Sequence, residues 1–186
     1  MGSEKIVVIC EDVMQEKPIR AWLKSLGYNT KREVVFRTHP EAVLGHKRNN
    51  AWVEQRYVEE VQAQRVRAHR MQCALIVCRD GDEESVEEHA RTFDKRLANA
   101  SLDKRDANEN IALLIPQRNI ETWLVFLAGH NVNETDDYKA LCRTVDVAES
   151  VKRFAHLACG VEAQPDDCPS ALKVALENEC PRISKR

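Results

Sequence analysis

Three acidic side chains follow a short apolar run at alternate positions. The run, Ala74–Cys78, is too short for a buried helix and has the Ile and Val content of a buried strand, and Asp80, Asp82 and Glu84 come directly after it. If the chain stays extended there, alternate residues project to one side and the carboxylates converge. Carboxylate oxygens are hard ligands that suit Mg²⁺ or Mn²⁺. The alternative is a solvated acidic turn that caps the next helix.

Two further acids are predicted to lie at strand ends. Glu11 follows the apolar run Ile6–Cys10, and Glu121 comes shortly after the run Ile111–Ile115, at the start of an apolar helix. A glutamate in a first turn could instead be there because it interacts favourably with the helix dipole. Sites in parallel sheets form beyond the carboxyl ends of the strands. Three strand ends would therefore deliver acids to one rim, which favours a metal site.

The rest of the chain must position these acids, and it alternates between predicted strands and helices. Strands are predicted at Ile6–Cys10, Glu33–Arg37, Ala74–Cys78 and Ile111–Ile115, and helices at Gln15–Gly27, Asn49–Arg70, Glu83–Ala100, Asn119–Ala128, Val145–Leu157 and Ser170–Glu179. This order predicts an α/β fold with a mainly parallel four-stranded sheet flanked by helices. We expect an α/β domain over residues 1–130 and a helical C-terminal extension over 131–186, packed on one edge of the sheet.

Composition narrows the class of protein. The chain has 186 residues, 43% of them hydrophobic, which is enough for one buried core. Its seven cysteines form no CxxC pair, and the N-terminus does not read as a secretory signal, so we expect a reducing cytoplasm. No apolar segment is long enough to span a membrane.

Charge is distributed unevenly along the chain. Between Lys31 and Gln72 there are nine Lys and Arg against five Asp and Glu, whereas between Cys73 and Asn110 there are six against ten. This is compatible with an acidic metal centre beside an anion-binding surface. On the predicted helix Asn49–Arg70 and just before it, basic side chains gather in one sector that could bind a nucleic-acid backbone: Arg48, Arg56, Arg67 and Arg70. Lys47, just ahead of the helix, extends this positive region. A solvated helix face, with Glu54 and Glu59 nearby, is the alternative.

These residues resemble the topoisomerase–primase (TOPRIM) domain. That family has a glutamate after its first strand and D-x-D-x-E after a later strand, and the added acid after the next strand resembles OLD-type nucleases and related small proteins of bacterial phage-defence systems. The segment PQRNIETWLVFL is also similar to the P-x-x-x-x-E-x-W segment of small TOPRIM-like bacterial proteins. The resemblance covers roughly Ile6 to Ala128. Asp12 and Ser85 stand where the family commonly has glycine.

The resemblance implies a set of roles. Glu11, Asp80 and Asp82 would be metal ligands, Glu84 would support them, and Glu121 would be a further acidic member. The implied activity is that of a Mg²⁺- or Mn²⁺-dependent phosphodiesterase, a nuclease that cleaves DNA or RNA in a phage-defence system together with an ATPase partner. Arg118 and Lys17 are candidates for binding substrate or transition-state charge.

Two other functions stay open at this stage. One is a non-catalytic TOPRIM-like subunit that binds such a partner through its C-terminal helices. The other is a phosphatase or nucleotide-processing enzyme that uses the same acids on a small substrate. The sequence leaves open a homo-oligomer and does not distinguish DNA from RNA.

Overall fold

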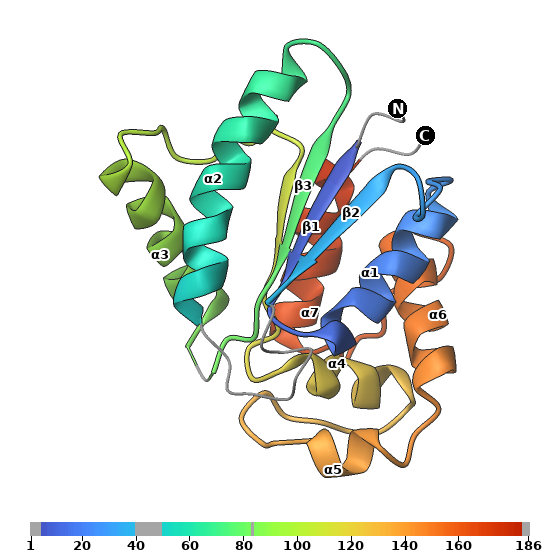
Figure 1. Cartoon of the computed structure of the whole chain (residues 1–186). Coiled ribbons are helices and arrows are strands. Elements are labelled where there is room, and N and C mark those ends of the chain that lie inside the picture. The colour runs from blue at the N-terminus through green and yellow to red at the C-terminus, as the bar shows by residue number, and fades with distance from the viewer. Residues whose placement is uncertain (1–4, 40–49, 83, 184–186) are drawn as a thin grey trace.

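A four-stranded parallel sheet forms the centre of the molecule (Figure 1). The computed structural model describes residues 5–39, 50–82 and 84–183. The strands lie in the order β2-β1-β3-β4, and all three neighbouring pairs are parallel. Their bounds are β1 Ile6–Cys10, β2 Val34–Thr38, β3 Ala74–Cys78 and β4 Ile111–Leu114. The predicted α/β fold with a parallel four-stranded sheet is therefore confirmed.

Helices cover both faces of this sheet, as Figure 1 shows. One face carries α1 (Val13–Ser25), α4 (Ile120–Leu127), α5 (Lys139–Cys142), α6 (Val147–Ala158) and α7 (Ser170–Val174), and the other carries α2 (Asn50–Ala68) and α3 (Val86–Asn99). Side chains alternate between the faces of a strand, so even-numbered residues of β1, β3 and β4 enter the first core and odd-numbered residues enter the second. Both faces are buried, which explains why these strands read as continuous apolar runs.

The C-terminal segment shares the core of the first face. Phe154 of α6 packs edge-on against Trp22 of α1, with ring centroids 6.5 Å apart, and stacks on Trp123 of α4 at 6.1 Å. After α7 the chain forms a π-helical turn, Ala175–Glu179, and a 3₁₀ turn, Cys180–Arg182. Glu179 accepts a 2.8 Å hydrogen bond from the backbone N–H of Leu113 in the edge strand β4. The extension thus covers one face and also reaches the β4 edge.

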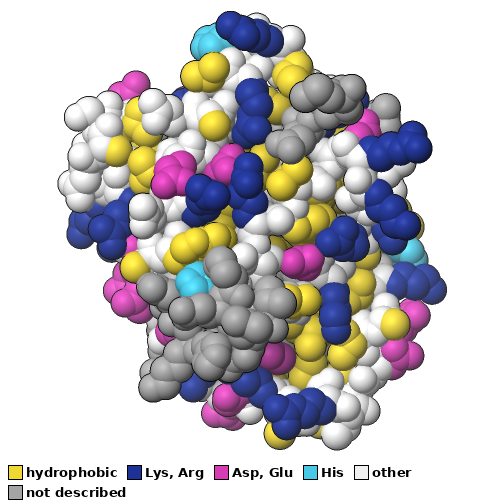
Figure 2. Space-filling view, in the orientation of Figure 1, with side chains coloured by type: hydrophobic (Ala, Val, Ile, Leu, Met, Phe, Trp, Pro, Cys, Tyr) yellow, Lys and Arg dark blue, Asp and Glu magenta, His cyan; other side chains and the backbone are white. Residues whose placement is uncertain are grey.

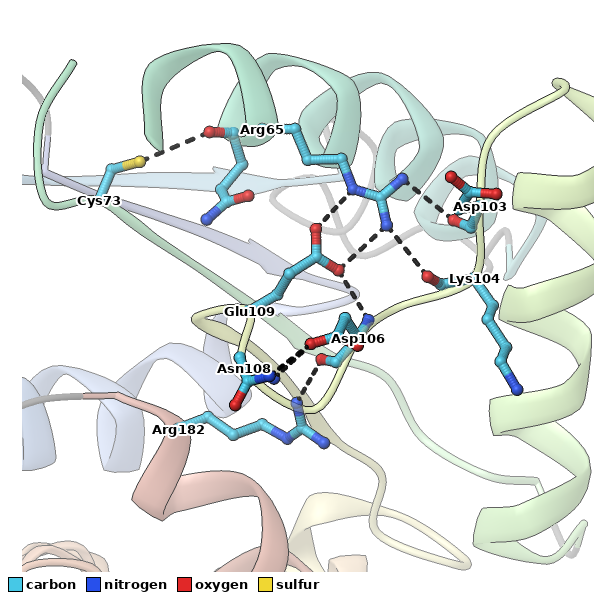
Figure 3. A network of polar contacts seen from close by, with 9 residues as sticks. Arg65, Cys73, Asp103, Lys104, Asp106, Asn108, Glu109 and Arg182 are labelled. Carbon is cyan, nitrogen blue, oxygen red and sulfur yellow. Dashed lines mark hydrogen bonds and ion pairs between the residues drawn. The ribbon is translucent and has the colours of Figure 1, made fainter. Parts of the chain in front are cut away.

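A polar network ties the loop before β4 to α2 (Figure 3). Arg65 of α2 donates to both carboxylate oxygens of Glu109, at 2.6 and 3.0 Å, and to the backbone carbonyls of Asp103 and Lys104. From the other side, Arg182 donates to the carbonyl of Asp106 at 3.0 Å. This network lies at the amino end of the sheet, because Glu109 precedes β4 and Arg65 is in the last turn of α2.

Candidate functional site

The connections that leave β1 and β3 diverge at the carboxyl ends of these neighbouring strands. β1 continues into α1 on one face of the sheet, and β3 continues into α3 on the other. A crevice forms at such a switch point, and it is the place where ligands bind in open α/β sheets. Cys10 and Cys78 are register partners at the ends of the two strands, and Glu11 and Asp80 follow within two residues. Both carboxylates therefore lie at the switch point.

Glu11 and Asp80 are joined in a closed set of hydrogen bonds through Gln15. The backbone N–H of Glu11 donates to Gln15 Oε1 at 2.8 Å, and Gln15 Nε2 donates to Asp80 Oδ1 at 2.8 Å. The backbone N–H of Asp80 in turn donates to Glu11 Oε2 at 3.2 Å. All three side chains are fully buried. The two acids predicted to lie at neighbouring strand ends are thus brought together, and an amide from α1 links them.

Two helix N-termini face this cluster, and each begins at a capping residue. Asp12 caps α1 by accepting hydrogen bonds from the backbone N–H groups of Met14 and Gln15. Asn119 caps α4 by accepting from Thr122 N at 3.2 Å. The next residue, Ile120, donates its backbone N–H to Asp80 Oδ1 at 3.1 Å. The first turn of α4 therefore contributes directly to the surroundings of Asp80, as expected for an anionic group at a helix N-terminus.

The loop after Asp80 is not extended, so the strand alternation from which convergence was predicted does not continue to Asp82. Asp82 has φ +49°, in the left-handed region, and its side chain is exposed. Gly81 lies against the loop that follows β4, and its N–H donates to Pro116 O at 2.7 Å. A Cβ at Gly81 would come within 2.5 Å of Gln117 O, which explains the need for glycine there.

Glu84 points away from the buried pair and toward α3. Its side chain is 61% exposed, and its carboxylate lies 3.6 Å from Nε2 of His89, which is buried and contacts Gly81 O at 2.8 Å. The neighbouring Ser85 caps α3 in a reciprocal capping box with Glu88. Serine at this position thus has a local structural role.

Glu121, Arg118 and Lys17 lie around the rim of the buried pair. Glu121 is half-buried in the first turn of α4, and Arg118 offers its carbonyl to Asp82 N at 3.4 Å. Lys17 is exposed on α1. Burial raises the pKa of the Cys142 thiol, Glu121 raises it further and Lys17 lowers it. The acid and the lysine therefore both act on the thiol of α5.

Two neutral thiols lie beneath the acids. Burial raises the pKa of Cys10 well above its usual value, and Glu16 and Asp12 add to this. Burial likewise raises the pKa of Cys78, with smaller contributions from Cys10 and Asp80. Because thiols bind metals as thiolates, oxygen ligands are the donors that this site offers at neutral pH.

The donor set of the site fits a hard divalent cation held by few protein ligands. Across residues 5–39, 50–82 and 84–183, no three His, Cys, Asp or Glu side chains group closely enough to hold a metal by themselves. Glu11 and Asp80 nevertheless supply two adjacent buried carboxylates, and Mg²⁺ is usually bound through one or two carboxylates together with substrate phosphates and water.

The predicted arginine surface on α2 is largely engaged in ion pairs. Arg56 pairs with Glu59, and Arg67 pairs with Glu60 at 3.5 Å. Arg67 lies in the last turn of α2 and Arg70 beyond it, so both are at the opposite end of the sheet from the acids (Figure 1). Lys47 and Arg48 fall outside the described residues. On the face seen in Figure 2, basic side chains are scattered among acidic and hydrophobic ones.

Sequence reasoning missed Gln15, although a signal was present. Gln15 shares the helical spacing of Ile19, Trp22 and Leu23, which form the buried face of α1. A polar side chain on an apolar helix face needs hydrogen-bond partners, and here it finds them on the two acids.

The segment before α5 was also missed: Asp137 accepts a 3.2 Å hydrogen bond from Asn119 Nδ2 at the rim of the site. That contact is long-range and has no local sequence signal.

The chain matches no protein-family model, no curated protein and no solved structure. Among the helices that the structure describes, none combines the length and the apolar character needed to cross a membrane.

Proposed function

We propose that this chain is a Mg²⁺- or Mn²⁺-dependent phosphodiesterase that cleaves DNA or RNA. The observation that carries the proposal is the pair of fully buried carboxylates, Glu11 and Asp80, joined at the switch point of a parallel sheet. Buried acids that are held by specific partners are a common feature of catalytic sites. The resemblance to TOPRIM nucleases includes these two residues, together with Asp82, Glu84 and Glu121.

Each residue of the site has a distinct role in this proposal. Glu11 and Asp80 would hold the cation, and Glu121 would add a carboxylate from the rim. When bound, the divalent cation activates water and neutralises charge on the phosphate. Lys17, which is exposed on α1, and Arg118, which precedes α4, would bind the phosphate oxygens of the substrate. The exposed carboxylate of Asp82 would act only if the cation or substrate draws it toward the pair.

Cleavage assays with matched variants test this proposal. The full chain is incubated with plasmid, single-stranded DNA and tRNA in Mg²⁺ or Mn²⁺, beside Glu11→Gln, Asp80→Asn and the control Glu149→Gln, whose side chain is 66% exposed on α6. We expect cleavage to fall about 100-fold or more in the first two variants and to be unchanged in the control. Cleavage that survives both site substitutions would sink the assignment.

Calorimetric titration with Mn²⁺ gives a second readout that does not depend on a partner protein or on the choice of substrate. We expect the wild-type chain to bind Mn²⁺, and Glu11→Gln and Asp80→Asn to bind it at least about tenfold more weakly. A wild-type chain that binds no Mn²⁺ would contradict a metal-dependent reaction at this site.

A further inference from the structure

Gln15 occupies a position that packing alone would give to an apolar residue. It lies on the buried face of α1, in line with Ile19 and Trp22, and its side chain is fully buried. Burying an amide without hydrogen bonds costs free energy, and a methionine would fill the same space at no such cost. The amide is therefore explained by what its two polar atoms contact.

Those contacts determine how the amide is oriented. The partner of one atom is the backbone N–H of Glu11, which can only donate, so the atom that faces it must be the amide oxygen. The NH₂ group then faces Asp80 Oδ1, to which it donates at 2.8 Å. If the amide were flipped, its NH₂ group would face the N–H of Glu11 and its oxygen would face Asp80 Oδ1. Donor would then meet donor, and acceptor would meet acceptor.

This orientation has consequences for both acids. Gln15 Nε2 and the backbone N–H of Ile120 both donate to Asp80 Oδ1, and together they limit the rotation of that carboxylate. Gln15 Oε1 accepts a hydrogen bond from the N–H of Glu11 and so fixes the backbone where β1 ends. The backbone N–H of Asp80 donates to Glu11 Oε2 and fixes that side chain. One side chain on α1 thus sets the relative placement of acids that follow two different strands.

We propose that Gln15 is the positioning residue of the metal site: it fixes Asp80 relative to Glu11, so that the two carboxylates can bind one divalent cation together. This role rests on the proposed function, because it presumes that the pair binds a metal. Residues that orient metal ligands in this way commonly change metal affinity about 10- to 100-fold when they are replaced.

The first test compares two buried glutamines. Gln15→Met removes the amide and keeps the volume, and Gln64→Met makes the same change at a glutamine of α2 that is 2% exposed and lies in the opposite helical layer. We expect Gln15→Met to weaken Mn²⁺ binding about 10- to 100-fold in calorimetric titrations and to alter the electron paramagnetic resonance line shape of bound Mn²⁺. Gln64→Met should change neither. Gln15→Asn, which keeps the amide but is one methylene too short to span both acids, should behave like Gln15→Met.

The second test is a double-mutant cycle without metal. Gln15→Met, Asp80→Ala and the double variant are unfolded in urea in the presence of a chelator. If the amide and the carboxylate interact, the combined effect on the unfolding equilibrium constant should differ from the product of the single effects by about tenfold.

The outcomes separate the two proposals. Weaker Mn²⁺ binding in Gln15→Met and Gln15→Asn, together with coupling in the cycle, supports the positioning role. Wild-type Mn²⁺ affinity in both variants overturns it, and so does a cycle without coupling, while the proposed phosphodiesterase stands. A wild-type chain that binds no Mn²⁺ overturns the proposed function and the positioning role with it, whatever the cycle shows.

Discussion

Arg79 and Glu54 form an ion pair in which each side chain is more than nine-tenths buried. Arg79 Nη1 lies 2.5 Å from Glu54 Oε1, and the side chains are 7% and 8% exposed. Arg79 directly precedes Asp80, whereas Glu54 lies in the first turns of α2. Arg96 of α3 occupies the other oxygen of Glu54 at 2.6 Å. The segment that leads into the acid pair is thereby tied to both helices of the second face.

We expect the loss of Glu54 and the loss of Arg96 to differ strongly in their effect on the free energy of unfolding. Glu54→Ala leaves the buried Arg79 charge without its partner and should lower the free energy of unfolding by about 3–5 kcal/mol. Arg96→Ala removes a side chain that is 49% exposed and should cost about 1 kcal/mol or less. Urea unfolding of both variants measures the difference. Equal losses would contradict the burial argument.

The close approach at Gly81 gives a prediction that links stability to the site. Gly81→Ala would place a Cβ 2.5 Å from Gln117 O and 2.9 Å from Pro116 O, so the two loops must separate, at a cost of about 1–3 kcal/mol. The neighbouring Asp80 and Ile120 would move with them, and we expect Mn²⁺ affinity to fall as well.

Gly129→Ala is the matched control for this substitution. Gly129 has φ +92°, and a Cβ added there would meet no atom within 4 Å, so alanine should cost about 1–2 kcal/mol through the backbone alone. Thermal unfolding and Mn²⁺ titration distinguish the two. If Gly129→Ala reduced Mn²⁺ affinity as much as Gly81→Ala, the effect would be general destabilisation.

The contact between Arg65 and Glu109 should make stability depend on acid pH. Partial burial raises the pKa of Glu109, but hydrogen bonds from Arg65 and from the Asp106 N–H outweigh it, and the net shift is downward. A carboxylate with a lowered pKa stabilises the fold above its unfolded pKa and loses this contribution as pH falls. Wild-type stability should therefore decline between about pH 5 and pH 3.

Arg65→Met should flatten this decline, because it removes the main hydrogen-bond donor of Glu109. Urea midpoints measured from pH 7 to pH 3 give the two curves. Lys152→Met serves as the control, since it removes an ion pair whose carboxylate, on Glu149, is 66% exposed. Parallel curves for wild type and Arg65→Met would show that Glu109 does not carry the pH dependence.

Much of the fold follows from local patterns in the sequence. The four strands were predicted to within one residue at each end. Three of them, β1, β3 and β4, are buried on both faces and therefore read as unbroken apolar runs. The long helices were also predicted, since their apolar spacing and caps are local. The short helix α5 and the π-helical turn at Ala175–Glu179 were not predicted. Glu179, at the end of this turn, accepts a hydrogen bond from Leu113 N in β4, which is a long-range contact without a local sequence signal.

The sequence by itself determined which acids follow the strands, and parallel strands place such acids at one rim. Tertiary structure decided which of them meet. The strand order makes β1 and β3 neighbours, so Glu11 and Asp80 come together, while the left-handed backbone at Asp82 and the contact of Glu84 with His89 turn the next two acids outward. Gln15 joins the pair only because α1 packs over both strand ends. Local spacing shows which side chains lie on each face of an element. Contacts between elements depend instead on strand order and loop geometry, which arise from packing over the whole chain.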